Sequence, residues 1–196
     1  MKIATFNKGP FIFFLLASFY TLSLFIAPFT LEPGTVENLD GNANMIDYMD
    51  RWDDMSPYHS LIYTFSDFNC HQKSSRSYYI NENQMPVCAR DVGIFTGMSI
   101  GLFIMMFIQS RRDYKDIILD LLHINKNYTQ GRKSWIIVIL GLITVLPMAL
   151  DGGIQLVTSY ESTNPLRTIT GLLFGFGFSV FICSLILSSL HDIKFE

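Results

Sequence analysis

The sequence is poor in charge and in cysteine, and each shortage excludes a class of protein. Only 16% of its 196 residues are charged, and no basic run of any length occurs, which argues against nucleic-acid binding. Three cysteines are too few for a small domain held together by disulfides. Apolar residues are abundant instead, since 49% of the chain is hydrophobic and the mean hydropathy is +0.30. This balance indicates a polytopic membrane protein rather than a soluble domain.

Four apolar segments are long enough to approach the span of a bilayer, whose hydrocarbon core needs about 20 residues of helix. A secretory signal peptide is the competing interpretation of the first segment, but the candidate cleavage point after Ala27 is followed by Pro28, so we expect a retained helix. Shorter amphipathic helices are predicted over residues 58–68 and 114–122. The sequence predicts an all-α fold in a single membrane domain, residues 1–196, with spans at about 10–30, 92–110, 134–150 and 168–190 and a helical extracytoplasmic lobe over residues 31–91.

The distribution of charge predicts how the chain is oriented. Nine of the fourteen lysines and arginines lie in the N-terminus, the loop 111–133 and the C-terminal stub. Twelve of the seventeen acids lie in segments 31–91 and 151–167. The positive-inside rule then places both termini in the cytoplasm of a multi-pass cell-membrane protein. Residues 70–91 and 151–167 would share the extracytoplasmic side.

Glycines form tracks in two of the predicted spans. Gly93, Gly97 and Gly101 recur at every fourth position of the second span, and Gly171 and Gly175 repeat the spacing in the fourth. Such small-residue tracks let a neighbouring helix approach closely within the membrane. We therefore expect these five glycines at helix–helix contacts.

Two cysteines flank a polar segment and allow two interpretations. Cys70 and Cys88 are separated by seventeen residues, and a structural disulfide between them would contribute about 3 kcal/mol. The other interpretation is a metal site, because Cys88 and Asp91 have the two-residue gap of a metal knuckle and Cys70 or His71 would complete the ligand set. Such mixed ligands suit zinc, or copper if the softer ligands dominate.

Charged residues lie where the predicted helices meet the membrane edge, where they are costly unless paired. Arg90 precedes the second span, Asp151 follows the third, and Glu161 and Arg167 precede the fourth. The first interpretation is a set of structural ion pairs, joining either arginine to either carboxylate. The second is a pocket in which these groups and His71 bind an anionic headgroup or perform acid–base chemistry.

Several separated motifs follow one another in a specific order: Cys70-His71-Gln72, Arg76-Ser77, Gln84-Met85-Pro86-Val87-Cys88-Ala89-Arg90, Gly93-Ile94-Phe95-Thr96-Gly97, Asp151-Gly152 with Gln155, Glu161-Ser162-Thr163-Asn164 with Arg167, and Thr170-Gly171. Over roughly residues 60–180 this set resembles a family of small archaeal and bacterial membrane proteins known as a domain of unknown function. The family hallmark is Cys-His-Gln followed by Cys-Ala-Arg-Cys, and here Asp91 stands in place of the last cysteine. The resemblance implies a four-helix membrane fold and no established activity. Asp91 weakens a site made of thiolates alone, which favours the disulfide without excluding a mixed-ligand site.

These observations predict function in outline. We expect a non-catalytic accessory or assembly subunit of a larger membrane complex, such as a metalloenzyme, in contact with lipids and other membrane subunits. One alternative is a membrane-embedded enzyme that acts on a lipid-linked anion through the acid–base pocket described above. A second alternative is a metal carrier that uses Cys70, His71 and Cys88.

Overall fold

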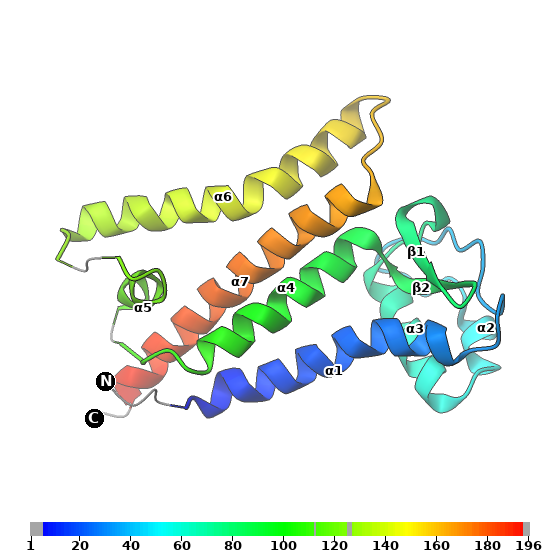
Figure 1. Cartoon of the computed structure of the whole chain (residues 1–196), viewed down its shortest axis with the longest axis horizontal. Helices are drawn as coiled ribbons and strands as arrows, with labels where there is room; N and C mark the ends of the chain where they lie inside the picture. Colours follow the sequence, from blue (N-terminus) through cyan, green and yellow to red (C-terminus); the bar gives the residue numbers. More distant parts are fainter. Residues whose placement is uncertain (1–5, 112, 125–126, 194–196) are drawn as a thin grey trace.

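The computed structural model describes residues 6–111, 113–124 and 127–193. Long helices lie side by side, and a small lobe covers one end of them (Figure 1). α1 and α6 run toward the end that carries the lobe, whereas α4 and α7 run away from it (Figure 1). Residues 70–91 and 151–167 therefore lie at the same end of the bundle. The bundle consists of α1 (Lys8–Thr30), α4 (Ala89–Met105), α5 (Tyr114–Leu121), α6 (Gln130–Val157) and α7 (Asn164–Ile193).

Three helices, α1, α6 and α7, are long and apolar enough to cross a membrane. α4 occupies the place of the predicted second span but starts three residues earlier, at Ala89, and ends at Met105. Its 17 residues rise about 26 Å along the helix axis. Beyond α4 the chain turns, and the Asn7 side chain donates a hydrogen bond of 2.6 Å to the carbonyl of Ile108. The side chain of Asn7 thus caps the turn that replaces the last part of the predicted span.

α4 and α7 form the most extensive helix–helix contact, and glycines make it close. A Cβ atom on Gly97 would meet the carbonyl oxygen of Leu172 and lie 2.8 Å from the backbone nitrogen of Phe176. A Cβ on Gly175 would likewise meet the backbone of Ile94. All five glycines that the sequence assigns to helix contacts lie in this seam: Gly93, Gly97 and Gly101 on α4, and Gly171 and Gly175 on α7.

The lobe contains α2 (Met49–Asp53), α3 (Pro57–Asn69), the short 3-10 helix η1 (Ser74–Arg76), and an antiparallel hairpin of β1 (Ser77–Ile80) and β2 (Asn83–Cys88). The expectation of an all-α fold with a helical lobe is confirmed only in part, because the lobe also contains this hairpin. Asn81 and Glu82 connect the strands and both have positive φ, as a type I′ turn requires in order to match the twist of the strands. The fold is mostly helical, with one two-stranded sheet.

A buried carboxylate organises the first half of the lobe. Asp67 of α3 is fully buried, and its Oδ2 accepts hydrogen bonds from the backbone nitrogens of Asp47 and Tyr48 and, at 2.8 Å, from Nε1 of Trp52. The indole ring stacks on Tyr63, with ring centroids 4.9 Å apart. One aspartate thereby ties α2 and the loop before it to α3.

α3 forms where the amphipathic helix 58–68 was predicted, but its apolar face is only partly in the core. Ile62 is buried, whereas Leu61, Phe65 and Phe68 are about half exposed. Phe65 also packs edge-on against Tyr20 of α1. Exposed apolar side chains at positions i, i+4 and i+7 suit a helix that faces lipid.

Candidate functional site

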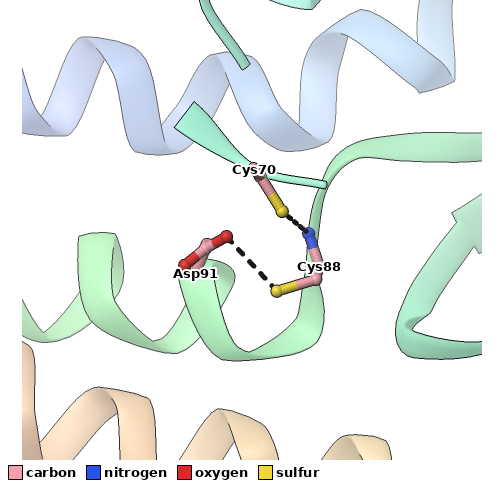
Figure 2. A group of neighbouring side chains, drawn as sticks. All are labelled: Cys70, Cys88 and Asp91. Carbon is pink, nitrogen blue, oxygen red and sulfur yellow. Dashed lines mark hydrogen bonds between the residues drawn. The ribbon is translucent and has the colours of Figure 1, made fainter. Parts of the chain in front are cut away.

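Two cysteines and one aspartate converge where the lobe joins the bundle. Cys70 follows α3, Cys88 ends β2 directly before α4, and Asp91 lies in the first turn of α4. One donor atom from each residue lies within 4.8 Å of the other two (Figure 2). The β1–β2 hairpin brings Cys88 back to Cys70. Cys88 is the N-cap residue of α4 and Asp91 its third residue, and side chains at these two positions lie close together. We call these three residues the thiol cluster.

Hydrogen bonds and burial fix the geometry of the thiol cluster. The backbone N–H of Cys88 donates to the Cys70 sulfur at 3.2 Å, and the Cys88 thiol donates to Oδ2 of Asp91, also at 3.2 Å (Figure 2). Both cysteines are buried, and Asp91 is half-buried. The hydrogen bond with the Cys88 side chain raises the pKa of the Cys70 thiol, and burial and the charge of Asp91 raise it further. Without a cation, Cys70 therefore keeps its proton at neutral pH.

The predicted disulfide is not formed. Cys70 and Cys88 are both free thiols, as is Cys183 in α7. The Cys88 sulfur is directed at Asp91, and the Cys70 sulfur faces the backbone nitrogen of Cys88 (Figure 2). A disulfide would need the two sulfur atoms about 2.05 Å apart, so these side chains would have to rotate toward each other.

His71, the fourth metal-ligand candidate, is not part of the group of converging donor atoms. Its Nδ1 accepts a hydrogen bond from the backbone nitrogen of Lys73 at 3.2 Å. Burial lowers the pKa of His71, and the positive charge of Arg76 lowers it further. The imidazole is therefore neutral at pH 7.

Three arginines and two carboxylates form a second group at the same end of the bundle, which we call the arginine cluster. Arg90 of α4 donates to Asp151 of α6 at 2.6 Å. Arg167 of α7 and Arg76 of η1 both donate to Oε1 of Glu161, at 3.4 and 3.2 Å. The ion pairs of the first interpretation are therefore present in the structure.

Gln155 completes the arginine cluster. α6 continues past its glycines at 152 and 153, so Asp151 and Gln155 lie one turn apart on the same face. The Gln155 amide is assigned with its oxygen toward the guanidinium groups, where it accepts from Arg76 at 2.6 Å and from Arg167 at 3.2 Å. The lobe, α6 and α7 are thus joined through polar side chains.

Two buried amides that sequence analysis did not single out as functional position the thiol cluster. The Gln84 side chain donates to the carbonyl of Gln72 at 2.5 Å, and the Gln72 side chain donates to the carbonyl of Pro86 at 2.7 Å. Both amides are fully buried. They tie the segment after Cys70 to the strand that ends at Cys88. The sequence did carry a signal for them, since Gln72 belongs to the Cys-His-Gln motif and Gln84 opens the motif that ends at Cys88-Ala89-Arg90.

Two cavities among the described residues lie away from both clusters. One of about 510 Å³ lies between α5, α6 and α7, and one of about 220 Å³ lies between α1, α4 and α7. Neither is lined by a residue of the thiol cluster or of the arginine cluster. A catalytic role therefore stays a prediction for His71, Asp151, Glu161, Arg90 and Arg167.

Comparison with known proteins places these clusters in a wider group. A family model described as "Predicted membrane protein (DUF2085)" matches residues 70–181, a range that holds both clusters. An uncharacterized protein of Methanocaldococcus jannaschii is 33% identical over 157 residues, which cover 80% of this chain and 79% of that protein. An uncharacterized protein of Methanothermobacter thermautotrophicus is 32% identical over 111 residues, 57% of this chain and 81% of that protein. No solved structure matches the chain.

Proposed function

The chain belongs to the DUF2085 family of predicted membrane proteins, and from this premise we propose that it is a zinc-binding integral membrane protein whose ligands are Cys70, Cys88 and Asp91. The observation that carries the proposal is the convergence of two sulfur atoms and a carboxylate oxygen within 4.8 Å. The donors come from two separate segments, the end of α3 and the start of α4. A bound ion would therefore join the lobe to the bundle.

The donor set fits zinc in chemistry and in size. Zinc accepts cysteine sulfur at about 2.3 Å and carboxylate oxygen at about 2.0–2.2 Å in a tetrahedral arrangement, so neighbouring donors lie roughly 3.5–3.8 Å apart. The 3.2 Å between the Cys88 sulfur and Asp91 Oδ2 is already close to that separation. The carboxylate favours zinc over copper(I), which prefers softer ligands. Three protein ligands leave a fourth position for water or another small ligand.

Two features beside the cluster favour negatively charged ligands and oppose the burial that raises the pKa of the Cys70 thiol. The cluster lies at the N-terminal end of α4, where the helix dipole favours negative charge. The backbone N–H of Cys88 donates to the sulfur of Cys70, and hydrogen bonds of this kind orient a metal ligand. Zinc binding would displace the proton that Cys70 carries in the metal-free protein.

Metal analysis of the full chain purified without chelators tests the proposal. We expect about one zinc per chain in the wild type and in Cys183→Ser, and far less in Cys70→Ser and Cys88→Ser. Cys183 is a matched control because it is a buried free thiol on α7, outside the cluster. Asp91→Cys should keep the metal, and cobalt substitution should show one additional cobalt–sulfur bond.

Two results would contradict the zinc site. One is equal metal content in the wild type and in Cys88→Ser. The other is alkylation, read by mass spectrometry, in which Cys70 and Cys88 are blocked together until a reductant is added, because this would show that the pair exists as a disulfide.

We further propose that α4 also crosses the membrane, which makes four spans with α1, α6 and α7, and that the lobe is extracytoplasmic. Two observations support the proposal. α4 lies between α1 and α7 and runs antiparallel to α1 (Figure 1), and lysine and arginine are in excess in loop 111–133. Single cysteines at Ser75 and Gln109, in a chain without its native cysteines, lie before and after α4. A membrane-impermeant maleimide added to intact cells should label Ser75→Cys alone, and labelling of both positions would refute the crossing.

A role as an accessory subunit is the second candidate. It is favoured by α6, on which Lys133 and Asp151 are the only buried residues, so a wide apolar face is available to another membrane helix. Native electrophoresis after gentle extraction from the native membrane should then show a complex larger than the single chain. Migration as a single chain would exclude this role.

A further inference from the structure

The arginine cluster carries more positive than negative charge. Among the described residues it contains the guanidinium groups of Arg76, Arg90 and Arg167, but only the carboxylates of Asp151 and Glu161. The nearby Lys73 adds no excess, since it pairs with Asp40. The side chains joined by these ion pairs therefore carry one more positive than negative charge.

Part of this positive charge is buried, where a charge without a partner is destabilising. The Arg167 side chain is only 2% exposed. In the described ranges, Nε of Arg90 and Nε of Arg167 are buried with no hydrogen-bond partner, and so is one acceptor, Oδ1 of Asp151. Buried charges near a membrane are retained only when they are paired. An additional anion would supply both the missing charge and acceptors for the unpartnered N–H groups.

Two helix ends add to the positive potential. α4 and α7 both begin at this end of the bundle (Figure 1), and the N-terminal end of a helix attracts anions through its dipole and its free N–H groups. Arg90 lies in the first turn of α4 and Arg167 in the first turn of α7. The helix ends and the arginines thus favour a ligand of the same sign.

The Glu161 carboxylate binds the guanidinium groups of Arg76 and Arg167 only weakly. Its side chain is 59% exposed, and a single oxygen serves both Arg76 and Arg167, at 3.2 and 3.4 Å. Strong charge-assisted hydrogen bonds are shorter, about 2.7–2.9 Å, and arginine prefers to bind two oxygens of one anion. An oxyanion with several acceptor oxygens would hold both guanidinium groups better than the carboxylate does.

We propose that Arg76, Arg90 and Arg167 form a binding site for a phosphate-type oxyanion, for which the Glu161 carboxylate is a replaceable stand-in. Phosphate suits the site because arginine forks match its geometry. The phosphate belongs either to a soluble ion or to a lipid headgroup, and the ends of α6 and α7 lie where headgroups would be. This site is independent of the zinc site, because none of its residues is a proposed zinc ligand.

Binding by the detergent-solubilised full chain tests the site with two probes. Inorganic phosphate is titrated by calorimetry, and phosphatidic acid is compared with phosphatidylcholine by native mass spectrometry. We expect Arg76→Gln, a partly exposed position that the fold should tolerate, to weaken binding about tenfold or more. Glu161→Gln should strengthen it several-fold, because the competing carboxylate is removed. Arg51→Gln and Glu37→Gln are matched controls, since both side chains are exposed and neither takes part in the ion pairs of the arginine cluster.

The two probes distinguish a soluble phosphate from a lipid headgroup, and some results would overturn the proposed site. Binding of inorganic phosphate identifies a soluble anion, and selective binding of phosphatidic acid alone identifies a headgroup; either result supports the site. Binding of neither probe overturns it, as does binding that Arg76→Gln leaves unchanged or that Glu161→Gln weakens. Zinc content measured on the same samples should be equal in Arg76→Gln and the wild type, so that loss of the fold or of the metal is recognised separately.

Discussion

Replacing Gly97 by alanine tests whether backbone contact holds α4 against α7. In the structure a Cβ at this position meets the carbonyl oxygen of Leu172 and lies 2.8 Å from the nitrogen of Phe176. Both obstacles are backbone atoms of α7, which no side-chain rotation can remove. The methyl group can be accommodated only if the two helices move apart.

The size of the effect follows from these distances. A carbon atom needs about 3.5–4.0 Å to its non-bonded neighbours, so α7 must retreat by roughly 1 Å at this level. Overpacking of a well-packed site costs about 1–3 kcal/mol, and the better helix propensity of alanine returns less than about 1 kcal/mol. We expect Gly97→Ala to lower the free energy of unfolding by about 2 kcal/mol.

Equilibrium unfolding in mixed micelles, followed by circular dichroism, measures this change. Gly141→Ala is the matched control, because a Cβ on Gly141 of α6 has nothing within 4 Å. That variant should be neutral or slightly more stable than the wild type, for reasons of helix propensity alone. Because both variants replace glycine by alanine in a helix, the difference between their free energies of unfolding measures the contribution of the close α4–α7 contact.

Gly101 sharpens the test. A Cβ there meets the hydroxyl of Ser179, a side chain, and lies 3.1 Å from the carbonyl oxygen of Phe176. We expect Ser179→Ala to rescue most of the loss in Gly101→Ala and none of the loss in Gly97→Ala. If Gly97→Ala proves as stable as Gly141→Ala, the close approach of α4 and α7 is refuted.

Two further predictions concern buried carboxylate and ion-pair contacts. Asp67→Ala leaves three donors without their acceptor and should destabilise the lobe by about 3 kcal/mol or more, seen as a change in Trp52 fluorescence that the exposed Asp53→Ala lacks. Lys133→Ala removes a 2.6 Å ion pair between α6 and α5 in which the lysine is 8% exposed. We expect the free energy of unfolding, measured by thermal denaturation, to fall by about 1.5–3 kcal/mol, as for a lost hydrogen bond to a charged group, against little change in the exposed Arg132→Ala. Equal stability of either variant and its control would contradict the corresponding contact.

Local patterns in the sequence predicted the parts of the fold that depend on local spacing. Apolar length placed α1, α6 and α7, and the four-residue spacing of glycines marked the faces that meet in the seam. Amphipathic periodicity located α3 and α5. Each of these signals repeats within one helix, so no knowledge of the partner segment was needed.

Contacts between distant segments were less accessible from sequence. The hairpin was missed because its Asn-Glu turn lacks the glycine typical of tight hairpin turns, and a strand buried along its whole length, as β2 is, shows no alternation. Spacing alone left both the disulfide and the metal interpretation open for Cys70 and Cys88. The structure shows both cysteines as free thiols, whereas the metal interpretation stays a proposal. The sequence likewise named two arginines and two carboxylates as ion-pair candidates, but it could not tell that Arg90 pairs with Asp151 and Arg167 with Glu161, because Arg90 and the two carboxylates come from separate segments.

The order of the helices in the seam has a consequence for biosynthesis. α4 is complete at Met105, whereas its partner α7 begins only at Asn164, so α5 and α6 must be made in between. At 5–20 residues per second this delay lasts roughly 3–12 s. During that time the glycine face of a short helix has no α7 to cover it. If α4 crosses the membrane, as proposed above, we expect the membrane-insertion machinery to retain α4 until α7 is made. A chain truncated after α6 should then anchor α4 less firmly than the full chain.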